Sequence, residues 1–220
     1  MSKTHLKSLL QNYSSIYSEE IASKEKMLKF LDESQDPFNK NLQSQLNKNI
    51  VNSVGLGYKE RGAKPIIIGE TTSDDVGESK SIDYGHFTAS AFLLNHDKTK
   101  FLLTHHKKLN KWLQLGGHCK SDNDILAEAI REAREESGIN EIEIISDQIF
   151  DIDVHYIPER PNEPAHYHYD IRFLLKTVNN DNFIKNDESQ ELKWFSFAGY
   201  PWLDIELERS VTRMIEKFKN

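Results

Sequence analysis

The stretch GHCKSDNDILAEAIREAREESGI, Gly117 to Ile139, places a glycine just before a segment of helical periodicity. Its glutamates are spaced i, i+4, i+7 and i+8, so they fall on one stripe of an α-helix: Glu128, Glu132, Glu135 and Glu136. Its apolar residues fall on the other side: Ile125, Leu126, Ala129, Ile130 and Ala133. This pattern predicts a helix with one buried face and one acidic stripe.

The acidic stripe is unfavourable for a helix on its own. Like charges one turn apart cost roughly 0.2 to 0.5 kcal/mol per pair. Arg131 and Arg134 relieve part of this repulsion, and a divalent cation would relieve more. Mg²⁺ prefers oxygen ligands and usually bridges protein carboxylates to substrate phosphates. From the helix alone, a metal site and a solvated acidic face both stay open.

The whole stretch resembles the Nudix box: G, five residues, E, seven residues, then REUxEExGU, where U is a bulky aliphatic residue. The spacing is intact, and the matching positions are Gly117, Arg131, Glu132, Glu135, Glu136, Gly138 and Ile139. Two positions depart from the pattern. Asn123 stands in place of the first glutamate, and Ala133 in place of a larger aliphatic residue. The flanking residues are similar to a bacterial MutT-like subgroup with an N-terminal helical extension.

The resemblance implies an enzyme, a pyrophosphohydrolase that acts on acid anhydrides. Its expected substrate is a nucleotide-type small molecule, a nucleoside diphosphate linked to another moiety. It also implies that Glu132, Glu135 and Glu136 are catalytic and hold Mg²⁺ or Mn²⁺, with one of them a possible base toward water. Arg131 is expected to orient a carboxylate.

Further residues complete the predicted site. Gly116 and Gly117 would let the backbone turn tightly and approach the phosphates. Glu188, or its neighbour Glu191, is the candidate for an additional carboxylate from outside the box. His118 would contact phosphate.

Aromatic and histidine side chains supply weaker candidates. Trp112 is the main candidate to stack on a base, and three other aromatic residues are possible: Phe87, Tyr156 and Tyr167. His166, His168 and Asp170 alternate, so they would share one face of a strand, with His155 before them. Such a face can bind metal or phosphate, or it can be a polar face of hydrogen-bonded histidines. His86 has a weaker claim.

Composition narrows the class of protein. The chain has 220 residues and a net charge of −7, which argues against binding to nucleic acid backbones or acidic membranes. It contains no apolar run of about 18 residues and no signal peptide, so we expect a cytoplasmic protein. Cys119 is the only cysteine, which excludes an intramolecular disulfide.

Patterning along the chain predicts an α/β protein. Residues 3–13 and about 17–34 read as helices, and residues 39–83 show no clear pattern apart from a short strand at KPIIIGE. From residue 85 the order is β, β, β, α, β, β, β, α, ending in a helix at about 203–217. This order predicts a mixed sheet between helices, which matches the Nudix fold. We expect an N-terminal helical extension with a connecting segment at 1–80, a Nudix hydrolase domain at 81–220 and possible homodimers.

Two other functions remain open. A noncatalytic Nudix-like module that binds nucleotides would keep the fold, and Asn123 favours it because one acid of the box is lost. A thiol hydrolase that uses Cys119 and His118 is the second alternative. Adjacent side chains seldom give a nucleophile and a base in hydrogen-bonding geometry, which disfavours it.

Overall fold

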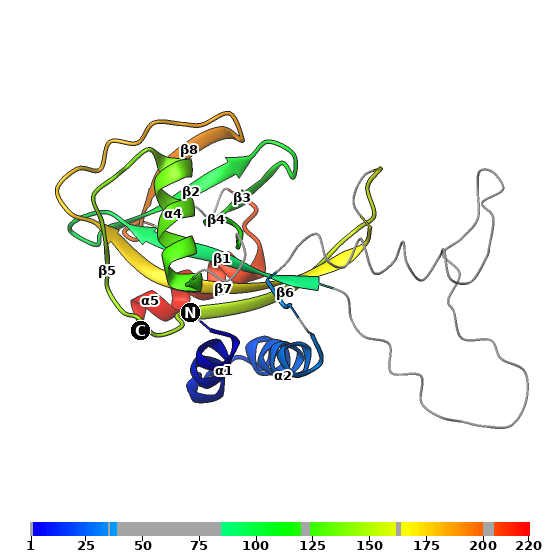
Figure 1. The fold of residues 1–220 in the computed structure, drawn as a ribbon. Coiled ribbons are helices and arrows are strands. Elements are labelled where there is room, and N and C mark those ends of the chain that lie inside the picture. Colours follow the sequence, from blue (N-terminus) through cyan, green and yellow to red (C-terminus); the bar gives the residue numbers. More distant parts are fainter. Residues whose placement is uncertain (1, 35, 39–84, 120–123, 162–163, 200–204) are drawn as a thin grey trace, which may run out of the picture.

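The computed structural model describes the chain except for residues 1, 35, 39–84, 120–123, 162–163 and 200–204 (Figure 1). The predicted KPIIIGE strand and Asn123 lie outside the described residues. Four helices are described: α1 (Lys3–Asn12), α2 (Ser18–Glu33), α4 (Ile125–Ser137) and α5 (Arg209–Lys219). The strands are β1 (Gly85–Leu94), β2 (Lys100–His106), β3 (Lys111–Leu113), β4 (Leu115–His118), β5 (Ile142–Ile144), β6 (Asp151–Ile157), β7 (His166–Thr177) and β8 (Ser189–Ser196).

The two longest strands form the centre of the sheet. β1 and β7 pair in parallel along ten positions, from Gly85 opposite Tyr167 to Leu94 opposite Lys176. The other pairings are antiparallel, with β4 and β2 along β1, β6 and β5 along β7, and β3 and β8 beside β2. The predicted mixed sheet and the predicted hairpin between β1 and β2 are therefore confirmed.

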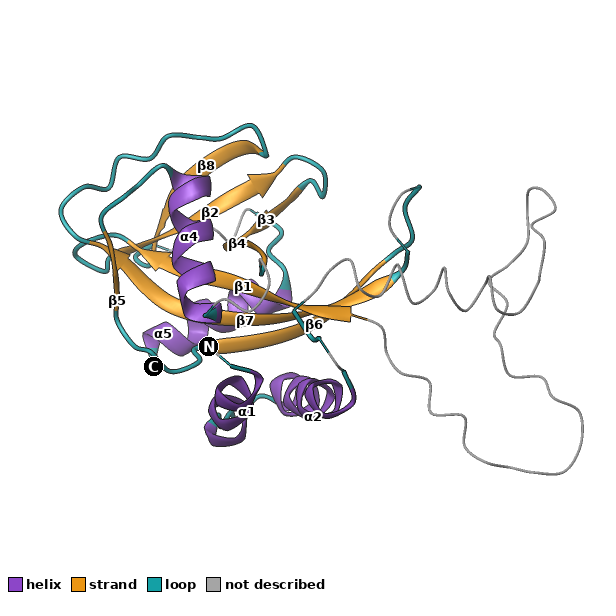
Figure 2. Ribbon diagram, in the orientation of Figure 1, coloured by secondary structure: helices purple, strands orange, loops and turns teal. Residues whose placement is uncertain are grey.

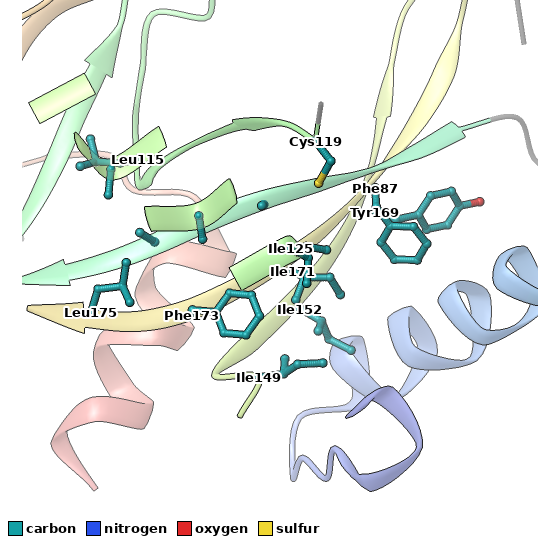
Figure 3. Packing of buried hydrophobic residues seen from close by; sticks show 14 of the residues in the cluster. Phe87, Leu115, Cys119, Ile125, Ile149, Ile152, Tyr169, Ile171, Phe173 and Leu175 are labelled. Atoms are coloured by element: carbon teal, nitrogen blue, oxygen red, sulfur yellow. The ribbon is translucent and has the colours of Figure 1, made fainter. Parts of the chain in front are cut away.

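Helices cover both faces of this sheet, as predicted (Figure 2). Residues of β1 at odd positions, such as Phe87 and Ala91, join a core cluster with α1, α2 and α4. Residues at even positions, such as Phe92 and Leu94, join a second cluster with α5. The alternation arises because successive side chains of a strand point to opposite faces. Figure 3 shows part of the first cluster, including Phe87, Cys119 and Ile125.

The N-terminal helices pack into the same core as the sheet. The ring of Phe30 from α2 stacks on Tyr169 of β7 with centroids 4.3 Å apart. The same elements also share a set of paired charges that we call the buried ion network: Glu20, Asp151, Arg172, Arg213 and Lys217. It joins α2 and α5 to β6 and β7. Residues far apart in the chain thus share one apolar cluster and one polar network.

The predicted boundaries of the elements need one correction. The prediction that the last helix begins near Leu203 is wrong, because α5 begins at Arg209. Leu207 instead forms an isolated β-bridge with Trp112, which requires extended backbone just before the helix. The two N-terminal helices agree with the prediction to within one residue. In the described part of the chain, every helix is too short or too polar to cross a membrane.

Candidate active site

Local signals in the sequence set both ends of α4. The side chain of Asp124 caps the helix by accepting a hydrogen bond from the Leu126 amide at 3.0 Å. Gly138 ends it in the left-handed conformation, with φ of +69°, and its amide donates to the Arg134 carbonyl. The predicted apolar face is confirmed, since Ile125, Ala129 and Ala133 are buried and Leu126 and Ile130 pack against the same core.

The glycines of β4 bring α4 against the sheet. β4 pairs with β1 so that Gly117 lies opposite Ala89 and Gly116 opposite Ser90. A Cβ atom added at Gly117 would lie 2.6 Å from Oε1 of Glu132, and one at Gly116 would lie 2.2 Å from Oγ of Ser90. Real Cβ atoms do not approach so closely, so Gly116, which also lies against the Ala89 carbonyl, requires glycine, and a side chain at Gly117 would displace the Glu132 carboxylate. Gly117 is therefore what allows the Glu132 carboxylate to lie against the strand.

We use the name acidic helix site for Arg131 and the four glutamates around it: Glu128, Glu132, Glu135 and Glu136. Arg131 donates to Glu128 at 2.6 Å, to Glu132 at 2.5 Å and to Glu135 at 2.7 Å. Burial opposes its charge, but these partners outweigh burial, so the pKa of Arg131 is raised. Arg134, the other predicted source of relief, donates from its Nε to the Asn140 carbonyl at 3.0 Å. One guanidinium is thus shared by three carboxylates.

Glu136 differs from the other glutamates in its surroundings. It is 8% exposed, and its Oε1 accepts a hydrogen bond from the Gly116 amide at 3.3 Å. Burial, followed by the negative charges of Glu132, Glu188 and Glu135, raises the pKa of Glu136 to about 8. The exposed Glu135 side chain lies at the open side of the site. The site therefore ranges from a buried carboxyl group to one that faces solvent.

The structure brings some predicted residues together and separates others. Glu188 lies in the turn before β8, and its charge acts on Glu136, which relates it to the acidic helix site. Glu191 lies on β8 opposite His105. The Trp112 ring stacks on His105 with centroids 5.0 Å apart and meets Phe195 edge-on.

The other three aromatic candidates are Phe87, Tyr156 and Tyr167, and they differ in burial. Phe87 is fully buried, which excludes it from the possible base-stacking residues. Tyr156 is largely exposed and lies against the Tyr167 ring.

Cys119 is buried in the first core cluster (Figure 3). Burial, followed by the charges of Glu128, Asp170 and Glu132, raises the pKa of its thiol. Because the thiolate is the nucleophilic form, a raised pKa makes this cysteine a poor nucleophile. The thiol hydrolase alternative therefore loses its support.

The histidines of β7 share one face, as predicted, and His86 joins them. The His86 ring lies 5.0 Å from His166 and 4.7 Å from His168. The carbonyl of His118 accepts a hydrogen bond from Arg131 at 3.3 Å, while its ring lies 4.9 Å from His86. Burial and the neighbouring imidazoles lower the pKa of His168. Sequence reasoning underrated His86 because only the parallel pairing of β1 with β7 brings it opposite His168.

Known proteins resemble this chain in two ways. Curated relatives match over segments of 35 to 55 residues, at most 23% of their own length. One is an uncharacterized protein of Rickettsia felis, 86% identical over 35 residues, which are 16% of this chain and 4% of that protein. The chain thus spans less than a quarter of the length of these curated relatives, so we infer no function from their names.

Solved structures are similar over a longer range. A Caenorhabditis elegans Ap4A hydrolase in a binary complex is 20% identical, over 60% of this chain and 94% of that chain, with a TM-score of 0.48. A NUDIX family hydrolase from Clostridium perfringens is 28% identical, over 61% and 96% of the two chains, with a TM-score of 0.47.

The family described as NUDIX domain matches residues 85–218. This range begins with β1 and ends within α5, so it contains the whole described sheet, the glycines of β4 and the acidic helix site. The chain therefore belongs to the Nudix family of hydrolases. The predicted family and fold class are confirmed.

Proposed function

We propose that this chain hydrolyses the pyrophosphate bond of a nucleoside diphosphate linked to another moiety, with Mg²⁺ or Mn²⁺ as cofactor. The observation that carries this proposal is the grouping of Glu132, Glu135 and Glu136. Glu132 lies against Gly117, and Glu136 accepts a hydrogen bond from Gly116. Among the described residues, Arg131 is the one guanidinium that bonds to this group, through Glu132 and Glu135. Membership of the Nudix family supports the reaction class.

The residues of the acidic helix site fit a hard divalent cation. All of the offered donors are carboxylate oxygens, which Mg²⁺ and Mn²⁺ prefer over nitrogen or sulfur. Burial raises the pKa of Glu136, and the charges of Glu132, Glu188 and Glu135 raise it further, so its charged form is disfavoured. A cation would stabilise that charged form. We assign Glu132, Glu135 and Glu136 as the residues that would hold it.

When bound, a divalent metal neutralises phosphate oxygens and lowers the pKa of a water molecule. The residues of the chain have separate tasks. Arg131 fixes the positions of Glu132 and Glu135 through its hydrogen bonds, so it acts as a positioning residue. One of the three glutamates accepts the proton of the attacking water, with Glu188 as the additional carboxylate.

The substrate we propose is a nucleotide-type small molecule. Gly116 and Gly117 are assigned to substrate binding, because glycine allows the backbone to turn tightly near the phosphates. His118 follows directly and is assigned to phosphate contact. Trp112 is assigned to the base through the ring face that His105 does not cover. We place the reaction in the cytoplasm and the hydrolase domain at residues 81–220, with residues 1–80 as the N-terminal extension.

The test is release of a nucleoside monophosphate from a panel of nucleoside diphosphates linked to sugars, alcohols or a second nucleotide. Each compound is incubated with the full chain and Mg²⁺, Mn²⁺ or a chelator. We expect turnover of at least one compound that depends on the metal and is lost in the Glu132→Gln variant. Cys119→Ala is the matched control and should keep full turnover, since the thiol has no role in this reaction. The solution mass of the same sample tests the expected homodimer.

The second candidate function is a noncatalytic nucleotide-binding module. The substitution of the first glutamate of the box by Asn123 favours it, although this residue lies outside the described structure. A binding module of this kind would bind one compound of the panel tightly and would hydrolyse none of them in the presence of metal. Calorimetric binding measurements with the same panel distinguish the two functions.

A further inference from the structure

Five of the nine histidines gather on one polar face of the sheet: His86, His118, His155, His166 and His168. They come from β1, β4, β6 and β7, and the pairing of the strands explains why they meet. His168 lies opposite His86 in the parallel pair and opposite His155 in the antiparallel pair. We call this group the histidine cluster. The sequence pattern indicates only His166 and His168, and the pairing of the strands adds the other members.

Three members of the cluster have the geometry of a metal site. One ligand atom each from His86, His166 and His168 lies within 4.8 Å of the others. Zn–N bonds of about 2.0 to 2.1 Å in tetrahedral geometry place ligand nitrogens about 3.4 Å apart. Small side-chain rotations are enough to close the difference. From this arrangement we propose that His86, His166 and His168 bind a transition-metal ion of the Zn²⁺ type.

The hydrogen bond of His166 prepares its ring for this role. Its Nδ1 lies 2.7 Å from the carbonyl oxygen of Pro164. A carbonyl only accepts hydrogen bonds, so Nδ1 carries the proton and Nε2 carries the lone pair. Metal-bound histidines commonly donate their other N–H to a backbone carbonyl or a carboxylate in this way. The backbone therefore selects the tautomer of His166 that binds metal through Nε2.

The position of His168 gives a second reason. Its Nε2 atom is buried and makes no hydrogen bond within the described residues. Leaving a buried polar atom without a partner costs roughly 1 to 3 kcal/mol. A metal ion bound by this nitrogen would remove that cost. The cluster thus contains a donor atom that the protein alone does not satisfy.

The chemistry of the donors separates this site from the acidic helix site. Imidazole nitrogens suit Zn²⁺ and related ions, whereas Mg²⁺ takes oxygen ligands. The two sites are neighbours, because the His118 ring belongs to the histidine cluster while its carbonyl accepts a hydrogen bond from Arg131. Three protein ligands leave the fourth position of a tetrahedral ion open to water or another small ligand. The inference does not depend on the hydrolytic reaction.

The experiment titrates the full chain, stripped of metal by a chelator, with Zn²⁺ in competition with a chromophoric chelator. We expect one tightly bound Zn²⁺ per chain. H166Q and H168Q should each weaken binding by at least about 100-fold, because loss of a ligand costs more than loss of its supporting hydrogen bond. H5Q changes an exposed histidine of α1 and should bind Zn²⁺ like the unchanged chain. E132Q should also bind it normally.

X-ray absorption at the zinc edge is measured on the unchanged chain, so misfolding of a variant cannot affect this test. A first shell dominated by nitrogen supports the histidine cluster, and a first shell of oxygen alone overturns it. Absence of stoichiometric Zn²⁺, equal binding by H168Q, or loss of binding in E132Q would also overturn it. Far-UV circular dichroism of H166Q and H168Q shows whether lost binding reflects a lost ligand.

Discussion

The acidic helix site and the buried ion network arrange the same chemical groups in opposite ratios. In the acidic helix site, one guanidinium, Arg131, is shared by three carboxylates. In the buried ion network, one carboxylate, Asp151, is shared by three cations: Arg172, Arg213 and Lys217. Burial raises the pKa of a carboxyl group in both places. For Asp151 the three cations outweigh burial and lower the pKa, whereas the pKa of Glu136 rises to about 8.

The difference separates a network in which cations outnumber the shared carboxylate from a site in which carboxylates outnumber the shared guanidinium. The charges of the network are matched by partners within the chain, so their contacts tie α2 and α5 to the sheet. Within the described residues, Arg131 is the one guanidinium that bonds to the acidic helix site, and the Glu135 side chain is largely exposed. Perturbed pKa values occur at functional sites and in structural networks alike, so the balance of charge is the more useful criterion.

The largest expected effect is on stability, from Arg213→Met in the buried ion network. Arg213 is 1% exposed and donates to both oxygens of Asp151, at 2.9 and 2.8 Å. Breaking a buried ion pair by removing one partner costs about 3 to 5 kcal/mol. Urea denaturation should show this loss, with turnover per folded molecule unchanged. Lys7→Met is the control, because its pair with the exposed Asp32 contributes about 0 to 1 kcal/mol. Equal losses in the free energy of unfolding for both variants would show that the buried ion network has no special structural role.

The next effect is on turnover, from Glu132→Gln in the acidic helix site. We expect kcat at saturating Mg²⁺ to fall about 100- to 1000-fold, as for loss of one preorganised charged contact. The free energy of unfolding should stay the same or rise, since the variant relieves repulsion between carboxylates. Glu143→Gln, an exposed glutamate of β5 paired with Lys176, is the matched control. A stability loss as large as that of Arg213→Met would make the acidic group structural.

Gly117→Ala tests how the site is assembled. The new Cβ would lie 2.6 Å from Oε1 of Glu132, so the carboxylate must move. The contact is with the end of a flexible side chain, so the loss of stability should be small, whereas turnover should fall because the carboxylate leaves its position. In a Glu132→Gln background the same change should lower turnover little further, because both act on one contact. Fully additive losses of turnover would show that Gly117 acts elsewhere.

The smallest effect concerns pH. The pKa of Asp151 lies below its ordinary value of 3.8 in the folded chain, because Arg213, Arg172 and Lys217 outweigh its burial. Its contribution to stability is therefore present above pH 3.8 and is lost as the pH falls toward the lowered value. The free energy of unfolding, measured from pH 6 to pH 3, should fall less steeply for Asp151→Asn than for the unchanged chain. Identical slopes would contradict the ion pairing of Asp151.

Local spacing made much of this molecule predictable. The helix α4, its apolar face and its acidic stripe depend on contacts between residues three or four apart. Strands β1 and β2 and the helices α1 and α2 were equally clear from short-range patterns. The start of α5 was not, because the bridge between Leu207 and Trp112 joins segments almost a hundred residues apart.

The sequence by itself determined the box, the family resemblance and the grouping of Glu132, Glu135 and Glu136, since these follow from periodicity within one helix. Only the tertiary structure decided which charges are matched. It buried Glu136 beside Gly116, and it surrounded Asp151 with three cations from β7 and α5. It also brought His86 to His166 and His168 through the parallel pairing of β1 and β7. Charge balance and ligand geometry depend on distances in space, and a linear pattern fixes those distances only within single elements.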